Sequence, residues 1–187
     1  MKSHRTIGVT ALALVIGAVP VRTTHAQGTP PAPQQGPVPC EQDPRFHEFD
    51  FWVGDWDVTP LQIPAANPRP QSRIEKILGG CVVLENWLPP GRPGGKSFNI
   101  YNRVTRRWEQ TWVDGGGNVV YFHGQARDGN MYYTSETPLP NGGVQLGKMS
   151  YLKVSADSVR QTWEMSTDAG KTWTKAFDGM YVRKKTP

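Results

Sequence analysis

The chain has 187 residues, with 21 Lys and Arg, 16 Asp and Glu, and a formal net charge of +5. This length suits one domain with a hydrophobic core of its own. The basic residues are scattered among acidic ones and form no stripe with interleaved aromatic residues, which disfavours a nucleic-acid-binding protein.

Residues 1–26 have the form of a signal peptide. Lys2 and Arg5 precede an apolar run over 6–19, and a small-residue cleavage site ends at Ala26. The run is too short to span a bilayer, and no second hydrophobic stretch follows it. We expect cleavage after Ala26 and export to the periplasm or the extracellular space, with no membrane attachment afterwards; an uncleaved anchor is the alternative. The mature chain then keeps 18 Lys and Arg against 16 Asp and Glu.

Residues 27–44 are rich in Pro, Gln and Gly and have almost no apolar side chains, so we expect a disordered linker. Cys40 and Cys81 are the two cysteines of the chain. In an oxidising compartment we expect a disulfide between them; two free thiols are the alternative. These cysteines and the two histidines of the mature chain lack the spacing of a zinc site, and we expect no metal.

From residue 45 to residue 185 the pattern is that of a single β domain. After a short helical turn over 46–53, apolar residues recur with a period of two, as in Trp108 and Trp112, and Gly-containing turns separate the runs. We expect ten strands, near residues 55–63, 72–78, 81–88, 96–103, 107–113, 118–126, 130–136, 143–154, 158–166 and 172–184.

Tight hairpins between successive strands predict an antiparallel meander, and closure into an up-and-down barrel removes its free edges. No crossover helices separate the strands, which excludes a parallel sheet. The loops at 64–71 and 89–95 contain Pro and Gly, and we expect both at one mouth of the barrel.

The segment WVGDWDV resembles the Gly-x-Trp start of calycin-type barrels, the superfamily of lipocalins, fatty-acid-binding proteins and nitrobindin-like proteins. The resemblance implies a barrel of eight to ten strands. It also implies that Arg183 from the last strand lies across Trp56, beside Gly54. The wider series GGCVVLENW, KSFNIYN, RWEQTWVD, VRQTWE and TDAGKTW is similar to a family of secreted bacterial domains of unknown function. That likeness spans residues 46–184 and implies no activity.

Nitrobindin-like proteins hold haem through a histidine of a late strand. This chain has no histidine after His123, so His123 and Met180 are the remaining candidate ligands. We therefore expect neither haem nor another cofactor.

Residues 166–173, STDAGKTW, match the Asp-box pattern of sialidase-like propellers once. We expect a structural hairpin here, in which Asp168 caps the turn, Gly170 adopts a positive φ and Trp173 packs beneath them.

Aromatic and uncharged polar residues share several of the expected strands. Facing inward, they would form an apolar pocket with a few orienting polar groups, and a solid core is the alternative. The candidate ligand-binding residues are Trp87, Asn99, Tyr101, Gln110, Trp112, Tyr121, His123, Gln161 and Trp163.

His123 and Glu85 are the candidate catalytic residues. Inside the barrel they would form a pair for proton transfer. The alternative is a His123 ring at a strand end, hydrogen-bonded to backbone or solvent. No nucleophile motif accompanies either residue.

The sequence therefore favours an exported, monomeric barrel that binds a small apolar or amphipathic molecule. A small enzyme that uses His123 and Glu85 is the second hypothesis. A filled barrel with a structural or interaction role, acting through the loops 64–71 and 89–95, is the third.

Overall fold

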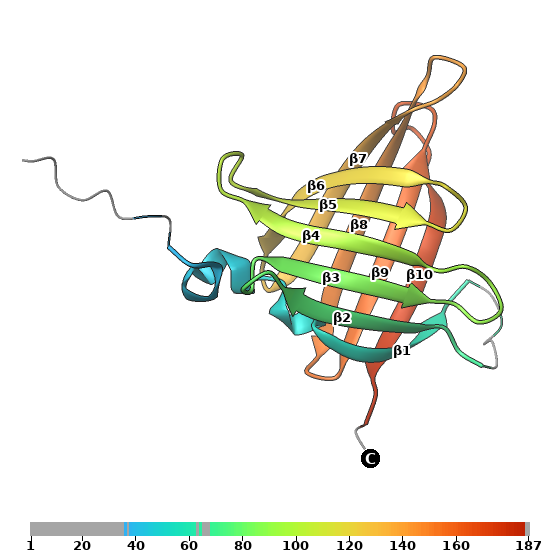
Figure 1. Ribbon diagram of the computed structural model, residues 1–187. Helices are drawn as coiled ribbons and strands as arrows, with labels where there is room; N and C mark the ends of the chain where they lie inside the picture. Colours follow the sequence, from blue (N-terminus) through green and yellow to red (C-terminus); the bar gives the residue numbers. More distant parts are fainter. Residues whose placement is uncertain (1–35, 37, 63, 65–67, 186–187) are drawn as a thin grey trace, which may run out of the picture. The chain divides into compact units, whose positions relative to one another are not determined.

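The computed structural model describes residues 36, 38–62, 64 and 68–185. The predicted signal peptide and most of the predicted linker lie outside these residues. The chain forms a closed antiparallel barrel in which each strand pairs with its sequence neighbours and the first pairs with the last (Figure 1). This confirms the predicted all-β, up-and-down barrel. Its strands are β1 (Gly54–Pro60), β2 (Gln71–Ile77), β3 (Val82–Leu88), β4 (Gly95–Asn102), β5 (Arg107–Asp114), β6 (Val119–Arg127), β7 (Asn130–Pro138), β8 (Val144–Ser155), β9 (Ser158–Ser166) and β10 (Thr174–Arg183).

The strands follow the two-residue period of the sequence. In β4, Ser97, Asn99 and Tyr101 are buried, whereas Phe98 and Ile100 between them are exposed. Because successive side chains of a strand point to opposite faces, this pattern places Ser97, Asn99 and Tyr101 inside the barrel.

Three short 3₁₀ turns close one end of the barrel: η1 (Cys40–Gln42), η2 (Pro44–His47) and η3 (Asp50–Trp52). Phe49 and Trp52 are fully buried there, with ring centres 4.9 Å apart, and the Phe49 ring lies 5.0 Å from that of Tyr151. Figure 1 shows the η turns at one end of the strands and the β1–β2 and β3–β4 connections at the other. Aromatic side chains therefore fill one end of the barrel.

A disulfide joins Cys40 of η1 to Cys81, the residue before β3, as predicted. Cys40 and Asp43 are buried. The prediction of a disordered linker is thus wrong for the C-terminal part of residues 27–44, because η1 and the start of η2 lie there and pack on the barrel. The disulfide fixes a segment whose composition alone would not bury a core.

The expected contact between Arg183 and Trp56 is present. The guanidinium carbon lies 4.2 Å from the ring centre, and Nη1 donates a hydrogen bond to the Val53 carbonyl at 2.9 Å. Gly54 has a φ of +137°, and a Cβ there would lie 2.1 Å from Arg183 Nη1. The Gly-x-Trp start and the final arginine thus form one contact across the β1–β10 seam, which is consistent with a calycin-like fold.

The turn between β9 and β10 is organised by Asp168. Its carboxylate accepts hydrogen bonds from the Ser166 hydroxyl at 2.7 Å and from the Thr172 amide at 2.9 Å. Gly170 has a φ of +83°, and Trp173 Nε1 donates to the Gly170 carbonyl at 3.0 Å. Hydrogen bonds from Thr172 and Ser166 lower the pKa of Asp168 to about 2. The Asp-box residues thus make a compact local turn.

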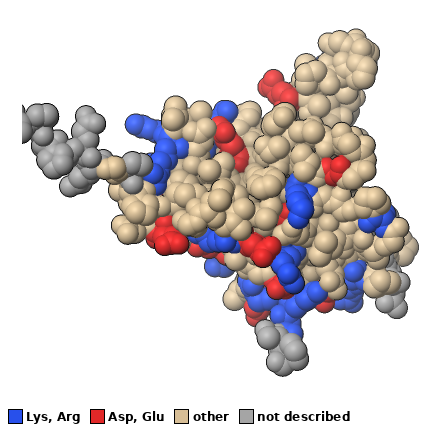
Figure 2. All heavy atoms as spheres, in the orientation of Figure 1, with Lys and Arg blue, Asp and Glu red and all other residues tan. Residues whose placement is uncertain are grey.

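Charged side chains of both signs are intermixed on the face shown in Figure 2. Arg73 pairs with Asp55 across β2 and β1 at 3.0 Å, and Arg160 pairs with Asp178 across β9 and β10 at 2.8 Å. Within the described ranges, no helix combines the length and the apolar composition needed to cross a membrane.

Candidate ligand-binding site

A cavity of about 650 Å³ occupies the end of the barrel opposite the η turns. Pro70 before β2 and Pro89, Pro90 and Arg92 after β3 line it together. The loops predicted at one mouth therefore do meet at this cavity. The barrel is hollow at one end, so the hypothesis of a filled interior is wrong.

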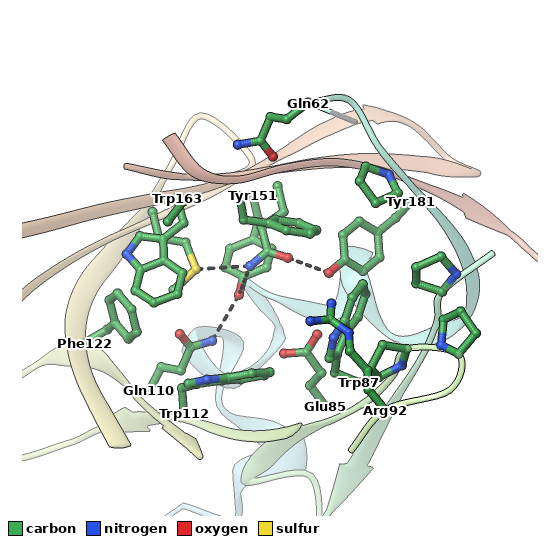
Figure 3. Close-up of a pocket in the computed structure, with 18 residues that line it drawn as sticks. Gln62, Glu85, Trp87, Arg92, Gln110, Trp112, Phe122, Tyr151, Trp163 and Tyr181 are labelled. Atoms are coloured by element: carbon green, nitrogen blue, oxygen red, sulfur yellow. Dashed lines mark hydrogen bonds between the residues drawn. The ribbon is translucent and has the colours of Figure 1, made fainter. Parts of the chain in front are cut away.

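Seven aromatic side chains from six strands line the cavity (Figure 3). Phe122 and Trp163 meet edge to face with ring centres 5.7 Å apart, and Trp87 and Phe177 do so at 5.8 Å. Such contacts hold the rings in fixed positions. The aromatic lining residues are Trp87, Trp112, Phe122, Tyr151, Trp163, Phe177 and Tyr181.

Amide side chains form a polar network toward the closed end. Asn99 Nδ2 donates to the Val83 carbonyl at 3.0 Å, and because a carbonyl can only accept, this bond fixes the orientation of the Asn99 amide. Asn99 Oδ1 then accepts from Gln110 Nε2 at 2.8 Å. Gln110 Oε1 is consequently left buried without a hydrogen-bond partner among the described residues.

The network continues to the opposite wall through Tyr151, as the dashed lines of Figure 3 show. The Tyr151 hydroxyl accepts from Gln110 Nε2 and from Gln161 Nε2, each at 3.1 Å. The Tyr181 hydroxyl donates to Gln161 Oε1 at 2.5 Å. Side chains of β5, β8, β9 and β10 are therefore held together across the barrel.

Glu85 of β3 places a carboxyl in the same cavity, although its side chain is only 3% exposed. The Ser72 hydroxyl donates to Oε1 at 3.1 Å and the Ser97 hydroxyl to Oε2 at 2.9 Å. Burial raises the pKa of Glu85 to about 7, against the opposing effect of the hydrogen bonds from Ser97 and Ser72. The carboxyl therefore changes charge near neutral pH.

The predicted ligand-binding residues divide into three groups. Five line the cavity: Trp87, Gln110, Trp112, Gln161 and Trp163. Asn99 lies behind the wall, hydrogen-bonded to Gln110, and Tyr101 packs against Phe46 near the closed end, with ring centres 5.7 Å apart.

Tyr121 and His123 form the third group and lie on the outer face of β6, so their expected position inside the barrel is wrong. Tyr121 is 69% exposed, and His123 shares its face. Val120 and Phe122 take the inward positions of this strand. The proposed pairing of His123 with Glu85 is therefore wrong too, because the barrel wall separates them.

Sequence reasoning missed Phe122, Met149, Tyr151, Phe177 and Tyr181 as lining residues. Tyr181 precedes Arg183 by two residues, so the expected Arg183–Trp56 contact already implied that Tyr181 points inward. Tyr151 offers no such clue, because its role depends on Gln110 and Gln161 from two other strands.

Within the described part of the chain, no group of three or more His, Cys, Asp and Glu side chains is arranged to hold a metal ion. Comparison of the sequence with protein-family models and with curated proteins finds no match.

Proposed function

We propose that this protein binds a small apolar or amphipathic molecule inside the barrel. The observation that carries the proposal is the cavity of about 650 Å³ with aromatic walls and few polar groups. Its volume lies within the range of roughly 300–1,000 Å³ typical of small-molecule sites. Burial of about 300 Å² of apolar ligand surface would contribute roughly 7 kcal/mol before the entropic cost of association.

The surrounding features support an exported, monomeric binding protein. A disulfide between Cys40 and Cys81 suits an oxidising compartment. Closure of the barrel pairs each of the ten described strands on both sides, which leaves none of them as an edge for another chain to extend.

A native mass spectrum of the protein from an oxidising compartment, before and after organic extraction, tests the proposal directly. We expect a mass above that of the chain, with an excess that extraction removes. A mass equal to that of the disulfide-bonded chain in both spectra would argue against a resident ligand.

Substitution of a cavity wall residue provides a second test. Trp112→Ala should weaken uptake of the neutral probe 1-naphthalenemethanol on the order of tenfold, because a large apolar contact is lost. Equilibrium dialysis measures this change. Tyr121→Ala is the matched control, since it removes an aromatic side chain from the outer face of the adjacent strand. Equal uptake by the two variants would contradict the assigned site.

Catalysis on a bound molecule is the second candidate function, and the buried carboxyl of Glu85 favours it. A buried carboxyl with a pKa of about 7 suits a general acid or base. This candidate now depends on Glu85 without His123. Glu85→Gln should then abolish turnover of a cavity ligand and preserve uptake of 1-naphthalenemethanol.

A further inference from the structure

We propose that the molecule held in the cavity is an organic cation with an ammonium group, for which Glu85 is the counter-ion. This inference rests on the proposed function and adds the charge of the ligand to it.

Glu85 is a buried carboxyl without a cationic partner. Among the described residues, no Lys, Arg or His nitrogen lies within 4.0 Å of its oxygens, whereas Asp178, equally buried, pairs with both Arg160 and Lys175. A buried charge without a partner is strongly unfavourable. A cation inside the cavity would supply the partner that the chain itself does not.

The side chains around Glu85 direct hydrogen-bond donors toward its carboxyl oxygens. The Ser97 hydroxyl accepts from Asn99 Nδ2 at 3.0 Å, and Asn99 is oriented by the Val83 carbonyl. The Ser97 hydrogen is therefore free to go to Glu85 Oε2, while Ser72 donates to Oε1. Two donors, one for each oxygen, match an ionised carboxylate.

Aromatic rings flank this carboxyl. Figure 3 shows Glu85 between Trp112 and Trp87, with Tyr181 across the cavity and Arg92 on the same side as Trp87 in this view. The faces of such rings attract cations, and Trp does so most strongly. A carboxylate among aromatic rings thus combines a counter-ion with an apolar environment that suits an alkyl- or arylalkylammonium group.

The other titratable groups of the described wall are Tyr151, Tyr181 and Arg92. Burial raises the pKa values of Tyr151 and Tyr181 well above the ordinary range, so both stay neutral. Arg92 is exposed on the β3–β4 connection and lines the cavity, and among the described residues it forms no ion pair with Glu85. Ionisation of Glu85 is therefore the change that a pH profile of binding would report.

Three naphthalene probes of similar size test the inference: 1-naphthylmethylammonium, 1-naphthalenemethanol and 1-naphthoate. Their affinities for the full chain are measured by equilibrium dialysis. At pH 8 we expect the ammonium probe to bind about tenfold more tightly than the alcohol. Its affinity should fall about tenfold from pH 8 to pH 6 as Glu85 takes up a proton, while that of the alcohol stays constant.

Glu85→Gln should remove the preference for the ammonium probe, so that the variant binds the ammonium probe no more tightly than the alcohol. Glu75→Gln is the matched control, because it removes an exposed carboxylate from the neighbouring strand β2. It should leave all three affinities unchanged. The pH profile of the unaltered protein makes the same test without any substitution.

Equal affinities for the ammonium and alcohol probes at pH 8 would overturn the inference and leave the proposed function in place. Tightest binding of 1-naphthoate, with that preference lost in Arg92→Ala, would overturn it in favour of an anionic ligand. Failure of all three probes would also overturn it. A co-purified molecule in the native mass spectrum would then still decide the proposed function separately.

Discussion

The carboxyl of Glu85 lies where desolvation and hydrogen bonding act in opposite directions. Burial raises its pKa, the hydrogen bonds from Ser97 and Ser72 lower it, and burial dominates, giving about 7 in the folded chain against an ordinary 4.5. Between these values the folded chain holds more protons than the unfolded chain. The contribution of Glu85 to stability is thus fully present below about pH 4.5, declines as the pH rises, and is lost above about pH 7.

Glu85→Gln removes this titrating group and should therefore change how the free energy of unfolding depends on pH. Relative to the unaltered protein, the variant should gain about 2 kcal/mol in free energy of unfolding between pH 5 and pH 8. Urea denaturation at both pH values measures the difference, and any constant effect of the substitution cancels. A difference that does not change with pH would show that Glu85 does not titrate in this way.

The sequence of β6 does not show which of its faces points inward. Residues 119–122 of β6 are apolar on both faces, so hydrophobicity alone does not say which face points inward. The expected inward position of Tyr121 is wrong for this reason. Phe122 occupies the interior instead, because it packs on Trp163 from the opposite wall, a contact invisible in the sequence.

At the scale of elements, Gly54 lets β1 and β10 meet at the seam of the barrel. Its φ of +137° is unfavourable for other residues, and the space of a Cβ is occupied by the Arg183 guanidinium. Glycine is therefore favoured at position 54 for two reasons, the positive φ of the backbone and the space that the Arg183 guanidinium occupies.

Gly54→Ala should lower the free energy of unfolding by roughly 2 kcal/mol, through backbone strain and displacement of Arg183 from Val53 and Trp56. Thermal or urea unfolding measures the loss. Gly142→Ala is the matched control, because that glycine also has a positive φ, whereas a Cβ added to it would meet nothing within 4 Å. Equal losses in the two variants would mean that the Arg183 contact adds nothing.

The strands themselves are predictable from the sequence. All ten lie within a few residues of their expected positions, because the two-residue period and the Gly-containing turns are local signals. The polar network is not predictable, since Gln110, Tyr151 and Gln161 come together only after closure of the barrel. Closure itself follows from the need to protect the free edges of a meander.

On the scale of the whole molecule, the barrel combines a filled end with a hollow end. Phe49, which precedes η3, and Trp52 of η3 fill the first end, and the disulfide attaches η1 to the residue before β3. The disulfide joins residues 41 positions apart, which in the chain-entropy model stabilises the fold by roughly 4 kcal/mol.

Replacing both cysteines by alanine should therefore lower the free energy of unfolding by about 4 kcal/mol, measured by urea denaturation. The two cysteines are replaced together so that no free thiol remains. Uptake of 1-naphthalenemethanol under native conditions should persist, because neither cysteine lines the cavity. A loss of uptake in the folded variant would place the η turns among the determinants of binding.

Because Phe49 and Trp52 close one end of the barrel, a ligand in the cavity can exchange with solvent only through the other end. A bound molecule leaves by the route of its entry, so an incoming competitor must wait for the site to empty. The residence time is then controlled by the chain segments at the mouth, among them Pro70, Pro89 and Pro90. The end of the ligand nearest the mouth stays within reach of solvent. A linker attached there would allow the protein to be captured on a resin with the ligand in place.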